Sequence, residues 1–83
     1  MNNRRSETVI LAEILRVVLE KPGITRVMYS ANLNHRAADK YLSELQKKGL
    51  IETVGQSLRR KFQTTPKGKE ALDRLEDALQ LLQ

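Results

Sequence analysis

Two groups of mostly cationic side chains are the best candidates in this sequence for binding a charged partner. One group would share a single side of a helix, at intervals of four, three and four residues: Arg36, Lys40, Ser43 and Lys47. A second group, Arg59-Arg60-Lys61, is continuous. Ammonium and guanidinium groups clustered in this way bind phosphates, and the release of counterions supplies much of the affinity. Both groups therefore predict contacts with a polyanion.

The distribution of charge points to the same part of the chain. The 83 residues include 15 lysines and arginines and 10 acidic residues, which give a net charge of +5. Residues 26–61 hold eight cations and three anions, whereas residues 66–83 hold three cations and four anions. An evenly solvated surface would not separate charge in this way. Unpaired bases stack on aromatic side chains, which make up only 4% of this chain, so binding of single-stranded nucleic acid is disfavoured.

The sequence offers no candidate catalytic centre. It contains no cysteine, and His35 is its one histidine, so no thiolate nucleophile and no cluster of transition-metal ligands is expected. It also has no glycine-rich phosphate loop. We therefore expect a protein that is not an enzyme and that uses no cofactor, no metal and no small-molecule substrate.

The expected location is the cytoplasm, in association with the nucleoid. The apolar stretch near the start is interrupted by Glu13 and Arg16 and is not followed by a cleavage site typical of signal peptides. No apolar run approaches the roughly 18 residues that a membrane-spanning helix needs. The lack of cysteine also fits a reducing compartment.

Three helices are expected in the first half of the chain. The first begins after Ser6, a capping residue, and ends at Pro22-Gly23. The second covers residues 24–31, and the third lies between Asn34 and Gly49. Their inward faces comprise, in chain order, Leu11, Ile14, Leu15, Val18, Val27, Met28, Ala31, Ala38, Tyr41, Leu42 and Leu45.

A hairpin and a fourth helix complete the predicted elements. Residues 50–54 and 60–64 contain β-branched or aromatic side chains and flank a loop at residues 55–59, so they predict two antiparallel strands. Thr65 followed by Pro66 is typical of a helix start, and that helix continues to the C-terminus.

The order of these elements predicts a mainly α fold with a small β-hairpin, the winged helix-turn-helix. The second and third helices are joined by about three residues, as in a helix-turn-helix. The fold would then consist of a three-helix core, a wing and a C-terminal dimerisation helix. We expect residues 1–65 to form the DNA-binding part and residues 66–83 to form the dimerisation helix of the same domain.

Three segments of the chain resemble one known family. They are residues 28–34 with Lys40-Tyr41-Leu42, then Gly49-Leu50-Ile51, then residues 62–68. Together they resemble an archaeal winged helix-turn-helix DNA-binding family of predicted transcriptional regulators, to which small archaeal chromatin proteins are related. The resemblance covers residues from about Arg4 to Leu82. It implies double-stranded DNA binding, with the third helix as the reading element, the hairpin as the wing, and pairing of the last helices as a coiled coil in a dimer.

The candidate DNA contacts follow from these positions. Arg36 and Lys40, near the start of the third helix, are best placed for base edges, and the wing cations for the backbone. Tyr29 and Tyr41 stand at positions compatible with the core, so they are assigned to packing and not to base stacking, and contact of the Tyr29 hydroxyl with a phosphate stays open. The full set of expected contacts is Arg26, Asn34, His35, Arg36, Lys40, Ser43, Lys47, Arg59, Arg60 and Lys61.

The last helix carries a leucine seam with two interpretations. The seam consists of Leu72, Leu75, Leu79 and Leu82. It can be buried on the first helix of its own chain or on a partner chain, because a helix this short is marginal in isolation. The first helix also carries apolar residues beyond one stripe, and Leu81 lies beyond the seam, so a homodimer is favoured.

The expected function is that of a dimeric transcriptional regulator that binds duplex DNA. Two alternatives stay open. One is a less selective chromatin protein, and the other is a winged helix that serves as a protein interaction module, because a fold alone does not fix a function.

Overall fold

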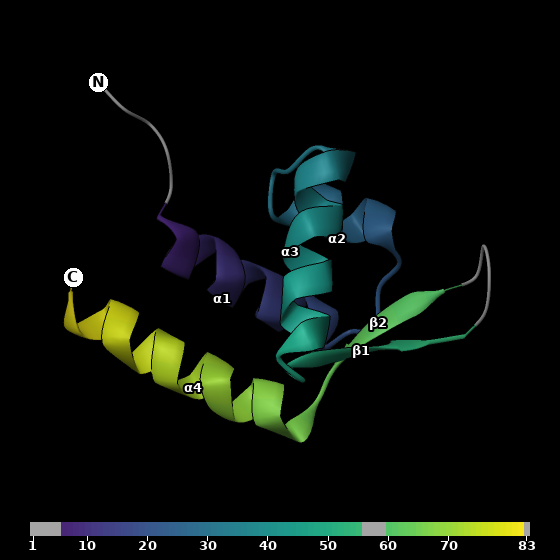
Figure 1. Ribbon diagram of the computed structural model, residues 1–83. Coiled ribbons are helices and arrows are strands. Elements are labelled where there is room, and N and C mark those ends of the chain that lie inside the picture. Colours follow the sequence, from purple (N-terminus) through teal and green to yellow (C-terminus); the bar gives the residue numbers. More distant parts are fainter. Residues whose placement is uncertain (1–5, 56–59, 83) are drawn as a thin grey trace.

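The computed structural model describes residues 6–55 and 60–82, and these form four helices and one hairpin (Figure 1). The elements, in chain order, are α1 (Glu7–Val18), α2 (Ile24–Ser30), α3 (His35–Lys47), β1 (Ile51–Val54), β2 (Lys61–Thr64) and α4 (Pro66–Leu81). Helix α4 runs beside α1, and the hairpin projects from the end of the molecule opposite to the two chain termini (Figure 1). The predicted fold class and element order are therefore confirmed.

Each predicted N-terminal cap is present. The Ser6 hydroxyl accepts a hydrogen bond from the Val9 amide, and the Asn34 carboxamide accepts one from the Ala37 amide at 2.8 Å. The Thr65 hydroxyl accepts a bond from the Gly68 amide at 3.0 Å and donates one to the Gly49 carbonyl at 2.7 Å. The start of α4 is thereby tied to the end of α3.

The end of α1 leaves none of its last four carbonyls without a donor. The carbonyls of Arg16, Val17 and Val18 accept from the three following turn amides, and the buried Thr64 hydroxyl donates to the Leu15 carbonyl at 2.9 Å. Such groups would otherwise have no intrahelical partner. The bond from Thr64 therefore satisfies α1 and fixes strand β2 against it.

One core joins all six elements. Its buried members are Ala12, Ile14, Leu15, Val17, Val18, Val27, Ala31, Leu42, Leu45, Ile51, Phe62 and Leu72. Leu11, predicted to face inward, is only half-buried, and Val17 is buried in its place. Helix α2 ends at Ser30, one residue before the predicted end, and Asn32 lies two residues further on with φ of 54°, a left-handed conformation that asparagine tolerates.

The hairpin is anchored through both strands, at the residue pair next to its loop end. Its register pairs Ile51 with Thr64 and Thr53 with Phe62. The Phe62 amide donates to the Pro22 carbonyl at 2.9 Å, in the connection between α1 and α2, and Gln46 of α3 bonds Thr53. The wing therefore holds a fixed position relative to α2 and α3.

Gly68 marks the closest approach between α4 and the chain segment that follows α3. Replacing it with alanine should destabilise the fold, because the added Cβ would lie 1.9 Å from the Leu50 carbonyl oxygen and 2.7 Å from the Thr64 Cγ2. Overpacking of this kind costs about 1–3 kcal/mol. We expect a lower midpoint of urea unfolding, followed by circular dichroism.

The matched control is Gly23→Ala. Its new Cβ would have the Arg60 carbonyl oxygen as its nearest neighbour, at 3.9 Å, and the backbone φ of −82° suits any residue. Its free energy of unfolding should stay within about 1 kcal/mol of the wild type. Equal midpoints for Gly68→Ala and the wild type would contradict the close approach.

Candidate nucleic-acid interface

Helix α3 divides its residues between the core and solvent. Ala38, Leu42 and Leu45 are buried, and on the opposite side Arg36, Lys40 and Lys47 are exposed, with Ser43 half-buried among them. The intervals of four, three and four residues keep these four side chains in one row along the helix. The structure therefore brings the predicted polar row together on one outward surface.

The two cations at the start of strand β2 point to opposite faces of the hairpin. The Arg60 guanidinium carbon lies 5.4 Å from the centre of the Phe62 ring, on the face that packs toward the core. Lys61 is exposed and alternates to the other face. Arg59, the third member of the predicted cluster, lies outside the described residues. Arg60, which immediately precedes β2, therefore lies on the Phe62 face, and Lys61, the first residue of β2, lies on the opposite face.

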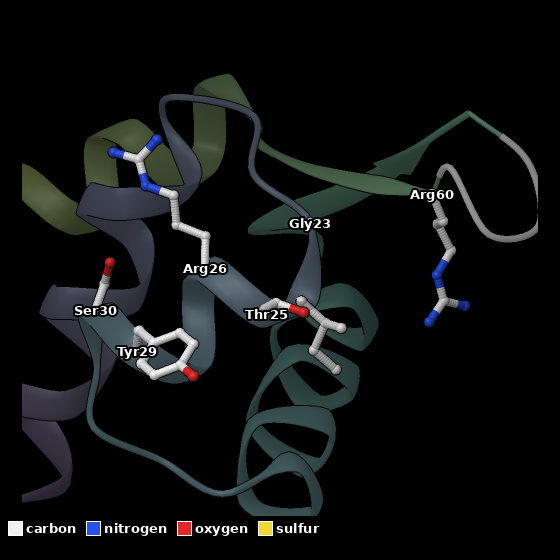
Figure 2. Close-up of a pocket in the computed structure, with 7 residues that line it drawn as sticks. Gly23, Thr25, Arg26, Tyr29, Ser30 and Arg60 are labelled. Atoms are coloured by element: carbon white, nitrogen blue, oxygen red, sulfur yellow. The ribbon is translucent and has the colours of Figure 1, made fainter.

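Arg60 lines a groove between the loop end of strand β2 and α2 (Figure 2). The groove has a volume of about 670 Å³, and its walls comprise Gly23, Ile24, Thr25, Arg26, Tyr29, Ser30 and Arg60. It combines two guanidinium groups with three hydroxyls and an apolar patch. These are groups that hydrogen-bond phosphate oxygens and contact sugars.

Arg26, another predicted contact, already has a carboxylate partner. It forms an ion pair with Glu20, which precedes it in the connection from α1. Figure 2 shows its side chain extending away from Arg60. Both partners are more than half exposed, so the pair contributes little to stability and can exchange for another anion.

Tyr29 was assigned to the core, and that prediction is wrong. Its side chain is 83% exposed and lines the groove, whereas Tyr41 is half-buried and packs against the core as expected. The helical period of α2 explains the difference, because Tyr29 lies opposite Val27, the buried residue of α2, and opposite Ala31, the buried residue that caps its C-terminal end. The helical period of the seven residues of α2 was therefore the sequence signal that could have predicted the exposure of Tyr29.

The two residues at the start of α3 are both exposed. Asn34 uses its side-chain oxygen to cap the helix, so its amide NH2 stays available for a partner. His35 is the first residue of the helix. Within residues 6–55 and 60–82, no group of three or more histidines and carboxylates is arranged to hold a metal ion.

The leucine seam of α4 is mostly used within the chain. Leu72 is 4% exposed in the core, and Leu75 and Leu79 are half-buried against it. By contrast, Leu81 and Leu82 are 85% and 83% exposed. Helix α4 also carries Glu76, whose carboxylate accepts bonds from Arg16 of α1 at 2.6 and 2.9 Å.

Among the helices described, none is long and apolar enough to cross a membrane.

The comparison with known families agrees with this architecture. The family model described as winged helix-turn-helix matches residues 4–83, which is nearly the whole chain. The chain belongs to the winged helix-turn-helix family. A relative with a similar sequence is the uncharacterised protein MJ0287 of Methanocaldococcus jannaschii, which is 32% identical over 80 residues. The aligned region makes up 95% of this chain and 78% of MJ0287.

Solved structures of winged helix-turn-helix proteins are also similar. Sso10a-2, a DNA-binding protein from Sulfolobus solfataricus, is 35% identical with a TM-score of 0.83, over 93% of this chain and 81% of its own. The MarR family regulator SPO1453 from Silicibacter pomeroyi has a TM-score of 0.73 at 16% identity, over 88% of this chain and 54% of its own, which shows a shared fold alone. The predicted resemblance to an archaeal winged helix-turn-helix family is thereby confirmed.

The two tyrosines should respond differently to truncation. We expect Tyr29→Ala to change the free energy of unfolding by less than about 0.5 kcal/mol, because the ring is solvated. Tyr41→Ala should cost more than about 1 kcal/mol, because it removes apolar area from the core. Urea unfolding of both variants measures this, and similar losses in the two would contradict the exposed position of Tyr29.

Proposed function

We propose that this protein binds duplex DNA through the outward row of α3 and acts as a transcriptional regulator. The observation that carries the proposal is the row itself. A single helix buries Ala38, Leu42 and Leu45 and presents Arg36, Lys40 and Lys47 on its other side. The DNA major groove is about 12 Å wide and admits an α-helix, and residues in the first turns of that helix contact base edges.

The wing and the α2 groove supply the proposed backbone contacts. Arg60, Thr25 and the Tyr29 hydroxyl line one groove and can donate to phosphate oxygens of a strand that borders the major groove. Lys61, on the other face of the hairpin, serves a neighbouring stretch of backbone. Arg26 joins by exchanging Glu20 for a phosphate, and Asn34 and His35 complete the contacts at the start of α3.

Relatives support this proposal in two ways. The solved structure of Sso10a-2, 35% identical to this chain, is described as that of a DNA-binding protein. The winged-helix fold is shared with a MarR family regulator and with Mb0332 of Mycobacterium bovis, a possible ArsR-family regulator with a TM-score of 0.60 at 16% identity, over 99% of this chain and 89% of that fragment. These folds are those of DNA-binding regulators and not of enzymes. In keeping with this, we place the protein in the cytoplasm, associated with the nucleoid.

The proposal includes a homodimer that joins the ends of α4. Leu81 and Leu82 are the most exposed large apolar side chains of that helix, and the half-buried Leu75 and Leu79 extend the same apolar surface. Leu72 belongs to the core of its own chain, so we assign it to the fold and not to the interface. The Mb0332 domain, for comparison, is described as homodimeric.

The DNA proposal predicts a salt dependence that resides in α3. For wild-type protein, the logarithm of the association constant should fall linearly with the logarithm of salt concentration, with a slope of about −0.9 per phosphate contact. The double variant Lys40→Ala with Lys47→Ala should bind arbitrary duplex more weakly and lower the magnitude of the slope by about two. Fluorescence anisotropy of a labelled duplex measures both quantities.

A variant of equal charge serves as the control. Lys69→Ala with Arg74→Ala removes two exposed cations from α4, and its slope should match that of the wild type. Equal losses of DNA affinity and of salt slope in the two double variants would contradict the assignment of the phosphate contacts to α3. An absence of binding by the wild type near about 50 mM salt would instead favour the protein interaction module.

The dimer proposal has its own test. Burying an exposed leucine contributes about 1.5–3 kcal/mol, so Leu81→Ser with Leu82→Ser should raise the dimer dissociation constant by at least about tenfold. Sedimentation equilibrium across a dilution series measures it, with Tyr29→Ala as a control of similar exposure on another surface. A wild-type protein that is monomeric at every concentration would contradict the proposed dimer.

A further inference from the structure

We propose that Asp39 is a specificity-determining residue that selects cytosine at one position of the DNA site. The inference rests on the proposed function, since it assigns a base preference to the same helix. Asp39 is a carboxylate beside the cations of the outward row on α3. A protein that bound DNA through charge alone would gain nothing from a negative group there.

The position of Asp39 on α3 places it beside the outward row. It is the fifth residue of the helix, three residues after Arg36 and four before Ser43, so it lies next to both on the helix surface. Gln46 lies two turns further along the same side and bonds Thr53 of β1. Asp39 therefore borders the row on the side that turns toward the hairpin, near the end of the helix that reaches base edges.

The fold itself gives Asp39 no task. The side chain is exposed, and within the part of the chain that the structure describes it forms no ion pair and no side-chain hydrogen bond. The helix start is capped by Asn34. The helix dipole favours acidic groups mainly in the first turn, and aspartate is a weak helix former. Arg36 lies three residues earlier, at the spacing of helical ion pairs, but among the described residues it forms no ion pair with Asp39. None of these effects explains a carboxylate at this position.

The chemistry of base edges then defines what Asp39 can contact. A carboxylate accepts hydrogen bonds and is repelled by phosphates. In the major groove, guanine and thymine present acceptors at their polar edge, and adenine places its N7 acceptor beside its amino group. The cytosine N4 amino group is a donor without a neighbouring acceptor on the same base. Cytosine is therefore the base that an aspartate at this position favours.

Glu44 provides a matched comparison on the same helix. It is exposed, but it lies five residues from Asp39 and on the other side of the outward row. It also precedes Lys47 and Lys48 by three and four residues, which is the spacing of helical ion pairs. Removing this charge alters the overall potential of the surface as removing Asp39 does, without touching the proposed base contact.

The experiment is selection from a random duplex library with wild-type protein, Asp39→Ala, Asp39→Asn and Glu44→Ala. A good base contact discriminates by about five- to 150-fold, so wild type should enrich cytosine at one position by at least about fivefold. Asp39→Ala should lose that preference and bind arbitrary duplex more tightly. Asp39→Asn should move it to adenine, which pairs with an amide through N6 and N7. Glu44→Ala should keep the wild-type preference.

The outcomes separate this inference from the function on which it rests. If the wild type binds DNA but enriches no base, or if Asp39→Ala keeps the wild-type preference, the role of Asp39 is overturned and DNA binding stands. If the wild type retains no duplex at low salt, the proposed function fails as well. Alanine is a better helix former than aspartate, so unfolding of Asp39→Ala does not confuse the result.

Discussion

The constraint on which the structure depends is the burial of one side of α3. Leu42 and Leu45 belong to the core that joins all six elements, and Ala38 is fully buried on the same side. A helix that commits these positions to the core has no rotational freedom left. Its other side, with Arg36, Lys40 and Lys47, must face solvent. The hydrophobic core thus sets the direction in which the positive charge is presented.

The remaining elements hold that helix in a fixed frame. The hydroxyl of Thr65 links the start of α4 to the end of α3, and the hydroxyl of Thr64 links β2 to the end of α1. Both threonines lie in one dipeptide at the junction between wing and last helix. Gly68 allows that junction to close, since a larger residue would collide with the Leu50 carbonyl. The wing, α3 and α4 are therefore held together by two hydrogen bonds from threonine hydroxyls to backbone carbonyls and by the close packing at Gly68.

Much of this could be predicted from the sequence because the signals are local. The caps at Ser6, Asn34 and Thr65 and the glycine after α3 specify helix ends through hydrogen bonds made within a few residues. What failed depended on three-dimensional context. Tyr29 was assigned to the core as standing at a compatible position, although the turn of α2 exposes it. The sequence lists Arg60 and Lys61 together, and it does not show that Arg60 lies over the Phe62 ring while Lys61 alternates to the other face of the hairpin. The groove between α2 and the wing brings Arg60 to residues more than thirty positions earlier, which no local pattern indicates.

The central claim is that one surface, made of α3 and the wing, contacts duplex DNA. The most direct measurement is a titration of isotope-labelled protein with an unlabelled duplex, followed by the chemical shifts of backbone amides. The account predicts that the largest changes fall in His35–Lys47 and Lys61–Thr64, with smaller ones at Thr25 and Tyr29. Changes confined to Pro66–Leu81, with α3 unaffected, would contradict it.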